Sequence, residues 1–432
     1  MRLGEITHRL AQAPTTGKLA LGMQNIVILK PYRFIPPCRS QFWSRLLVRV
    51  LMRPYLRRFY GIERFECIHG EKLRQSLDDD CGVLVVSNHI RPCDPMACGY
   101  LTRVVRQSMY CMASRHVFEN AWIDRVLSRR CGAFSIYREG TDHASLQFAV
   151  QSLVEPDRPI VIFAEGSAGR MNDRVQPMLD GSALIARTAA RRRAKQQPPG
   201  KVVIHPLAFK YFFRGDLAAS LEPVLSEMES RLDVPVKNGG DLLPRIRGIG
   251  NKYLAQQENK YLGNTQRETS DLHDRIEPLI EAMLMPLETK YGTAGGRSTY
   301  IRVQQVRTKL LPDLIAGRLS APEESERHEQ LRALYDIQEM ASFPRDYLGQ
   351  HATAERILET VEKLEDNLTG KITVHRPLDC IMQVGDAIEV SPRRTREKIS
   401  GAGNVALDPL TGQVESSIQS MVNHLSQRGA KP

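Results

Sequence analysis

His89 and Asp94 are separated by four residues, and Pro92 lies between them. A neutral histidine can accept a proton at one ring nitrogen while a carboxylate holds the other, so the pair could act as a general base and its orienting group. On a regular helix the two side chains would diverge by about 140°, but Pro92 should keep the segment irregular and let Asp94 fold back toward His89. The alternative is that Asp94 only caps a helix and that His89 is a loop histidine bonded to the backbone.

A short strand and a helix should position this pair. Val83 to Val86 is an apolar, mostly β-branched run of the kind found in buried strands, and turn-forming residues end it. Asp94-Pro95 then has the pattern of a helix start, with aspartate as N-cap and proline in the first turn. His89 is therefore expected in the loop between the strand and the helix.

A second polar stretch follows another predicted strand. The buried apolar run Pro159 to Phe163 leads into Glu165-Gly166-Ser167. Ligands of open α/β sheets bind beyond the carboxyl ends of the strands, so these three residues are candidates for substrate contact, although an ordinary tight turn is the alternative. The alternating stretch Cys131 to Arg138 predicts a strand that ends in an arginine, which could also be a simple surface ion-pair partner.

The composition narrows the class of protein. The chain has 432 residues, of which 42% are hydrophobic, so it can bury a large core as one large domain with additions or as two domains. Its formal net charge of +11 suits an anionic partner such as nucleic acid, an acidic membrane surface or a phosphorylated substrate.

Cysteine spacing and hydropathy indicate in which compartment the protein is expected and whether it spans a membrane. The eight cysteines form no CxxC pair and have no matching histidine cluster, which argues against a zinc site and indicates reduced, intracellular thiols. The sequence contains no run of about 18 apolar residues, so we expect no transmembrane helix. Charged residues within the first ten positions argue against a signal peptide.

Residues 41–60 predict a basic amphipathic helix. Arginines recur every four residues from Arg45 to Arg57, and Pro54 should bend or interrupt the helix. Between the arginines lie apolar residues, namely Phe42, Trp43, Leu46, Leu47, Val50, Leu51 and Met52. This pattern suits a helix that lies in a membrane interface. The alternative is a helix that packs its apolar face on the domain and leaves the arginines in water.

Strands and helices alternate over residues 82–210, which predicts an α/β fold. From residue 221 to about 370 the pattern becomes helical and charge-rich, and strand character returns after it. The expected division is 1–40 an N-terminal lead-in, 41–75 an amphipathic membrane-docking segment, 76–220 the α/β core, 221–370 a helical insertion or subdomain, 371–395 returning strands of the core, and 396–432 a polar tail.

Four short motifs stand in series along this chain: Asn88-His89 with Asp94, Gly132 to Arg138, Phe163 to Ser167, and Ile204 to Leu207 with Pro206. In order and separation they resemble the four motifs of the glycerolipid acyltransferase family, typified by lysophosphatidic acid acyltransferases. The first motif matches fully, a glycine-led strand ending in arginine fits the second, and a strand with a proline fits the fourth loosely. The resemblance covers residues 41–215.

The third motif departs from the family pattern, which is usually Phe-Pro-Glu-Gly-Thr-Arg. Ser167 replaces the threonine conservatively, whereas Ala164 replaces the proline and Ala168 stands where arginine is usual. Arg170 is two residues further on and could reach the same place. The change at Ala168 could indicate a different acceptor, such as a lysophospholipid with a larger head group or another lipid alcohol.

The resemblance implies an acyltransferase-like sheet flanked by helices, with an N-terminal amphipathic helical segment. A strand at 385–390 would close the core, so that 221–370 is a large insertion. The implied activity is transfer of a fatty acyl group from acyl-CoA or acyl carrier protein to the hydroxyl of lysophosphatidic acid or a related lysophospholipid. The enzyme would be peripheral on the cytoplasmic face of a membrane. Because a thioester is already activated, no covalent nucleophile, metal or further cofactor is expected.

The resemblance also implies roles for single residues. His89 would remove the proton of the acceptor hydroxyl, and Asp94 would fix the histidine tautomer. Glu165-Gly166-Ser167 would help to place the acceptor, and Arg138 would bind its phosphate in a two-pronged contact. Arg170 does not match a motif position, and it is a candidate for binding the same substrate only as a substitute for the arginine missing at position 168.

Three other classes of protein fit the sequence less well. A serine hydrolase built on Ser167 would need the pattern Gly-x-Ser-x-Gly, which fails because position 165 is glutamate. Nucleic-acid binding would rest on charge alone, since no basic and aromatic platform is visible. The third alternative is a non-catalytic lipid-binding or scaffold protein with an acyltransferase-like fold, and the intact His89 and Asp94 argue against it.

Overall fold

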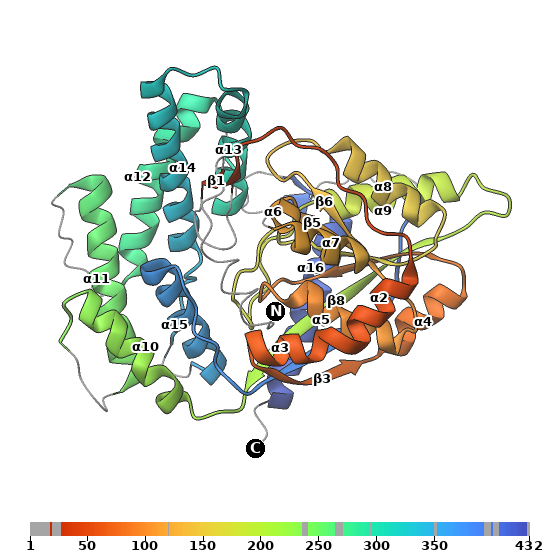
Figure 1. Ribbon diagram of the computed structural model, residues 1–432, viewed down its shortest axis with the longest axis horizontal. Helices are drawn as coiled ribbons and strands as arrows, with labels where there is room; N and C mark the ends of the chain where they lie inside the picture. Colours follow the sequence, from red (N-terminus) through yellow and green to blue (C-terminus); the bar gives the residue numbers. More distant parts are fainter. Residues whose placement is uncertain are drawn as a thin grey trace.

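The computed structural model describes residues 18–19, 27–119, 121–235, 241–263, 271–293, 295–296, 298–349, 352–392, 399–400 and 406–429. Most of the expected lead-in, 1–40, lies outside these ranges. An eight-stranded sheet is flanked by helices, and further helices form a lobe beside it (Figure 1). The predicted α/β fold class is confirmed.

The sheet has the strand order β3-β9-β8-β4-β7-β5-β6, with β10 beside β8. All neighbours along this order are parallel except β8 and β9, and β10 is also antiparallel to β8. The strands are β3 (Ile62–Ile68), β4 (Gly82–Ser87), β5 (Tyr110–Ser114), β6 (Ala133–Ile136), β7 (Ile160–Phe163), β8 (Val202–Phe213), β9 (Leu378–Val384) and β10 (Ile388–Glu389). Within the expected strand at 385–390, only Ile388–Glu389 forms a strand. Two separate short pairs are β1 (Lys18–Leu19) with β2 (Val27–Ile28) and β11 (Ile399–Ser400) with β12 (Ala406–Leu407).

Strand β4 lies in the middle of the sheet, between β7 and β8. Leu84 is in register with Ile160 on one side and with Ile204 on the other. All six residues of β4 are buried because helices cover both faces of the sheet. Val83 and Val85 belong to one hydrophobic cluster and Leu84 and Val86 to the other, as the alternation of a strand requires. The loop after β4 is therefore held on a rigid support.

Helices form a layer on each face of the sheet. Apolar residues of α3 and α5 join the cluster on one face, and those of α8, α9 and α16 join the cluster on the other. The helices of the core are α4 (Gly70–Asp78), α5 (Asp94–Val104), α6 (His116–Glu119), α7 (Trp122–Arg130), α8 (His143–Val154), α9 (Gly181–Arg193) and α16 (Pro409–Gly429). The expected polar tail at 396–432 differs from the structure, because buried Val414, Ile418 and Val422 of α16 pack on the sheet.

The predicted amphipathic helix is built from three segments, α2 (Gln41–Leu47), the π-helix η1 (Val48–Met52) and α3 (Arg53–Tyr60). The interruption predicted at Pro54 takes the form of the π-helix that precedes it. On a regular α-helix, positions four apart drift by about 40°. The wider turns of a π-helix offset that drift, so that one straight stripe of every fourth residue faces the core. That stripe consists of Ser44, Val48, Met52 and Leu56.

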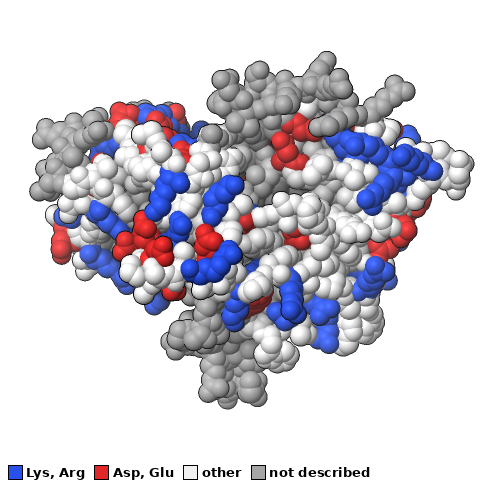
Figure 2. Space-filling model, turned by 90° about the horizontal axis from the view of Figure 1, so that it is seen from above, with Lys and Arg blue, Asp and Glu red and all other residues white. Residues whose placement is uncertain are grey.

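The helical lobe comprises α10 (Leu217–Arg231), α11 (Leu242–Leu262), α12 (His273–Tyr291), α13 (Thr299–Ala316), α14 (Ala321–Ala341) and α15 (Ala354–Thr369). Helices α12, α13 and α14 share a hydrophobic cluster of their own, whereas α10 and α15 contribute to the cluster beneath the sheet. Seen from above, charges of both signs cover the lobe, and a group of Lys and Arg side chains stands together at the opposite end of the molecule (Figure 2).

Candidate active site

The loop between β4 and α5 brings His89 and Asp94 together. Nδ1 of His89 lies 2.9 Å from Oδ2 of Asp94. The same oxygen accepts hydrogen bonds from the backbone N–H groups of Ile90 and Arg91, at 2.7 and 2.9 Å. The Asp94 side chain is fully buried, whereas the His89 side chain is 15% exposed. The predicted N-cap role of Asp94 is wrong: Cys93 is the N-cap of α5, no side chain caps this helix end, and the Asp94 carboxylate folds back onto the loop instead.

A tyrosine on β8 completes the surroundings of this carboxylate. The hydroxyl of Tyr211 donates to Oδ1 of Asp94 at 2.5 Å. Burial and the charge of Asp94 raise the pKa of Tyr211 well above its usual range, so the hydroxyl stays protonated as a donor. With Asp94 at Nδ1, the neutral His89 ring carries its proton there and presents the lone pair of Nε2. The ring packs on Phe163, with centroids 4.5 Å apart.

Two asparagine side chains extend the sheet beyond the end of β4. The amide of Asn88 donates to the carbonyl of Phe209 and accepts from its N–H, at 3.1 and 2.8 Å. Asn172 makes the same pair of bonds with Tyr211, both at 2.7 Å. These amides satisfy backbone groups of β8 that β4 is too short to reach. They therefore fix β8, and with it the tyrosine that holds Asp94.

The loop after β7 docks directly on the histidine loop. The N–H of Gly169 donates to the carbonyl of His89 at 2.8 Å, and the N–H of Arg170 donates to that of Ile90 at 2.9 Å. Glu165 is buried, which raises the pKa of its carboxyl well above the usual range, and it accepts from the N–H of Gln176. The two stretches predicted as site residues are thus neighbours in space.

Position 166 requires a glycine. Its φ of +82° lies in the left-handed region, where residues with a Cβ are strained. A Cβ here would also come within 2.8 Å of the hydroxyl of Tyr300, at the start of α13. The helical lobe therefore packs closely on the loop that carries Ser167, which is half-buried.

Arg138 also reaches this loop, but from a turn and not from the end of a strand. Strand β6 ends at Ile136, because Asp142 accepts from the N–H of Tyr137 and caps α8. Nη1 of Arg138 donates to the carbonyl of Gly166 at 2.9 Å. The predicted strand end was two residues too long, and the arginine nevertheless lies beside the candidate site.

Arg170 has a different setting from the one expected. Its side chain is buried, and Nη1 forms an ion pair with Oδ2 of Asp366 on α15 at 3.0 Å. The guanidinium is thus directed at the helical lobe, so the structure does not support Arg170 as a replacement for the arginine missing at position 168. Its φ of +45° belongs to the tight turn that docks on Ile90.

Helix α15 contacts both loops of the site through buried ion pairs. Arg91 pairs with Glu362 at 3.0 Å, four residues before the Asp366 that pairs with Arg170. Asp173, which follows the loop after β7, forms ion pairs with Lys210 on β8 and with Arg356 on α15. This set of paired charges joins the loops after β4 and β7 to a helix that is far away in the sequence.

Tyr211 and Asn172 belong to the site but were not predicted from the sequence. Tyr211 stands in the unbroken buried run of β8, where an aromatic residue normally indicates core packing. Asn172 lies in an irregular segment with no motif around it. Only the pairing of distant segments gives these two residues their partners.

Residues 64–210 match the family model described as Acyltransferase. These residues form an acyltransferase domain. It is the domain of the glycerolipid acyltransferase family, so the resemblance drawn from the motifs is confirmed for this stretch. The match supports a general acyltransferase function. No curated protein and no solved structure matched the chain.

The acyltransferase domain contains His89, Asp94 and the loop after β7, and it ends within β8. The amphipathic segment α2–α3 and the helical lobe lie outside the matched residues. Tyr211, Glu362 and Asp366, which complete the surroundings of the site, therefore come from beyond the matched stretch.

Removing the Glu362 carboxylate should destabilise the protein strongly. In Glu362→Ala the Arg91 guanidinium, 10% exposed in the structure, would stay buried without its counter-charge. We expect the free energy of unfolding, measured by urea denaturation, to fall by about 3–5 kcal/mol. Asp313→Ala is the matched control, because it breaks an exposed pair with Arg318, and it should change stability by less than about 1 kcal/mol. Equal, small effects of both substitutions would contradict this account.

Proposed function

We propose that the protein is a peripheral membrane acyltransferase. It transfers a fatty acyl group from acyl-CoA or acyl carrier protein to the hydroxyl of lysophosphatidic acid or a related lysophospholipid. The observation that carries the proposal is the bond between His89 and the buried Asp94, inside an acyltransferase domain. The other candidate from the sequence is a lipid-binding scaffold. Such a protein would not require a buried carboxylate surrounded by four hydrogen-bond donors.

In this proposal His89 is the general base. Nε2 takes the proton of the acceptor hydroxyl as its oxygen attacks the thioester carbonyl, and the C–S bond breaks when the tetrahedral intermediate collapses. The imidazolium then returns the proton to the departing thiolate. Such base catalysis contributes roughly 10²–10⁴-fold to the rate. Asp94 keeps the ring in the productive tautomer and stabilises the imidazolium by its charge.

Acceptor binding is assigned to the loops beside the histidine. Arg138 is bonded to the carbonyl of Gly166, so a phosphate held by its guanidinium would lie next to Glu165-Gly166-Ser167. A planar guanidinium can make two parallel bonds to a phosphate. The two loops are joined by backbone hydrogen bonds, which would keep the phosphate site and the base at a fixed separation.

The proposed membrane contact is the outer face of α2, η1 and α3. The face away from the core leaves large apolar side chains in solvent, namely Phe42, Trp43, Leu46, Val50, Leu51 and Tyr55, each 39–65% exposed. The exposed arginines from Arg45 to Arg57 run alongside them. An apolar face with a basic edge suits the interface of an anionic leaflet, such as the cytoplasmic face of a membrane.

Helix α7 extends this surface. The guanidinium of Arg130 lies 5.0 Å from the ring centre of Trp43, which places α7 beside α2. At its start Trp122 is 76% exposed. Among the described residues, no helix combines the length and the hydropathy that crossing a bilayer requires.

Replacing the proposed base should abolish turnover and spare membrane binding. For His89→Gln we expect acyl transfer to a lysophospholipid on vesicles to fall by about 10²–10⁴-fold, measured with a radiolabelled acyl donor. The matched control is His143→Gln, at an exposed histidine on α8, which should keep wild-type activity. Equal activity of the two variants would rule out His89 as the base. If even the wild type transferred nothing to any acceptor yet bound vesicles, the scaffold would be the better proposal.

A charge on the exposed apolar face should detach the protein from membranes. Leu51 is 45% exposed, so Leu51→Asp should leave stability unchanged. Burying a leucine side chain contributes about 1.5–3 kcal/mol, so co-sedimentation with anionic vesicles should weaken by about tenfold or more. Leu184→Asp, at a leucine that is 58% exposed on α9, is the control and should bind as wild type does. Undiminished binding of Leu51→Asp would place the membrane contact elsewhere.

A further inference from the structure

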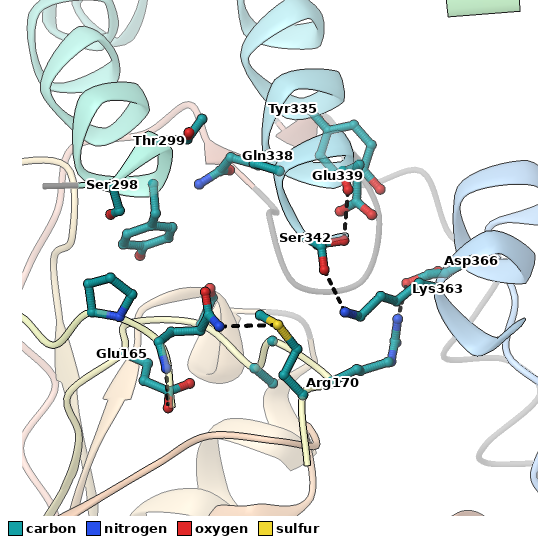
Figure 3. A pocket seen from close by; sticks show the side chains of 18 residues that line it. Glu165, Arg170, Ser298, Thr299, Tyr335, Gln338, Glu339, Ser342, Lys363 and Asp366 are labelled. Carbon is teal, nitrogen blue, oxygen red and sulfur yellow. Dashed lines mark hydrogen bonds and ion pairs between the residues drawn. The ribbon is translucent and has the colours of Figure 1, made fainter. Parts of the chain in front are cut away.

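A cavity of about 320 Å³ lies between the loop after β7 and the helical lobe (Figure 3). The loop residues 165–171 form its floor, next to the backbone that carries His89. Helices α13, α14 and α15 form the rest of the wall. Because the acyltransferase match ends at residue 210, most of this wall belongs to the part of the chain that the match does not cover.

The cavity lining is rich in groups that bind hydroxyls. Hydroxyls and carboxamides come from the floor and from two helices, namely Gln176, Ser298, Thr299, Tyr300, Tyr335 and Gln338. Each of these groups can donate and accept hydrogen bonds. The lining also has apolar residues, namely Ala168, Met171, Pro177 and Ala341, so these polar groups could hold a hydroxylated group within a partly apolar cavity.

The two basic residues that line the cavity, Arg170 and Lys363, stand against three acidic ones, Glu165, Glu339 and Asp366. Arg170 is paired with Asp366, and Lys363 faces Glu339 and donates to the carbonyl of Ser342 at 2.6 Å. Burial lowers the pKa of Lys363 and raises that of Glu339 to about 7, so neither group brings a full unpaired charge. A phosphate monoester, with nearly two negative charges, would need a clear excess of positive charge here. The lining therefore favours an uncharged group.

Three polar atoms around the cavity still lack a partner. Nη2 of Arg170, Oδ1 of Asp366 and Oε1 of Gln338 are buried without a hydrogen bond among the described residues. Arg170 and Asp366 are each more than nine-tenths buried. Leaving such atoms unsatisfied costs free energy; each is covered by its neighbours in the structure, so a ligand with several hydroxyls would bond to them after a small shift of these side chains. Figure 3 shows Gln338 extending from α14 toward α13, across the space above the floor.

We infer that this cavity binds an uncharged, hydroxylated head group of the acceptor lysophospholipid, and that Gln338 and Asp366 of the helical lobe select it. The inference rests on the proposed function and narrows it to acceptors with a phosphodiester and a polyol. The phosphate would lie at Arg138, beside the floor, and the polyol would extend toward α14. The lobe thereby acquires a role as the specificity-determining wall of the site.

The test compares lysophosphatidylglycerol with lysophosphatidic acid, each at the same mole fraction in the same vesicles. The wild type should show the higher kcat/KM for lysophosphatidylglycerol. Gln338→Leu keeps the volume of the side chain and removes its hydrogen bonds. It should lower kcat/KM for lysophosphatidylglycerol by about fivefold to tenfold, with less than about a twofold change for lysophosphatidic acid. Glu329→Gln, at an exposed residue on the same helix, is the control and should change neither value.

A second readout does not depend on turnover. Soluble glycerophosphoglycerol should show saturation-transfer NMR contacts with the wild type, and these should weaken in Gln338→Leu and in Tyr335→Phe. The inference is overturned if Gln338→Leu lowers both acceptors alike, or if it raises the KM of the acyl donor. Binding of the head group without any acyl transfer would instead overturn the proposed function and leave the cavity assignment standing.

Discussion

The buried carboxylate of Asp94 is the group on which the site depends. A carboxylate fully removed from water is tolerated only when donors surround it, and here two backbone N–H groups, Tyr211 and His89 do so. These bonds hold the loop after β4 in one shape and orient the histidine ring. The two asparagine bridges to β8 then fix the tyrosine. The geometry of the proposed base is thus a consequence of satisfying one buried charge.

The same principle explains how the helical lobe is attached. Arg91 and Arg170 are buried in the two loops of the site, and each needs a counter-charge, which α15 supplies as Glu362 and Asp366. A buried pair contributes little net stability but is costly to break. The lobe is therefore fixed in position over the loops, and in our account this position lets it build one wall of the acceptor cavity.

Sequence patterns predicted the α/β core because its strands are short apolar runs with loops at the expected places. They also identified the polar residues that follow two of these strands as site candidates, since ligands of α/β sheets bind beyond the carboxyl ends of the strands. They could not predict the partners of Arg170, because Asp366 lies 196 residues away. They also missed Tyr211, whose hydroxyl has a function only through Asp94. Local sequence patterns predict helices and strands. The partners of buried polar groups depend on how elements distant in the sequence pack together.

The most direct test of the central claim is the tautomer of His89. ¹⁵N-histidine NMR at alkaline pH, with the resonance assigned from its absence in His89→Gln, reports which ring nitrogen carries the proton. We predict the Nδ1–H tautomer, with Nε2 unprotonated, and a loss of this preference in Asp94→Ala, because no carboxylate would then accept from Nδ1. An Nε2–H tautomer in the wild type, unchanged in Asp94→Ala, would contradict the account, because the ring would then have no lone pair to offer the acceptor hydroxyl.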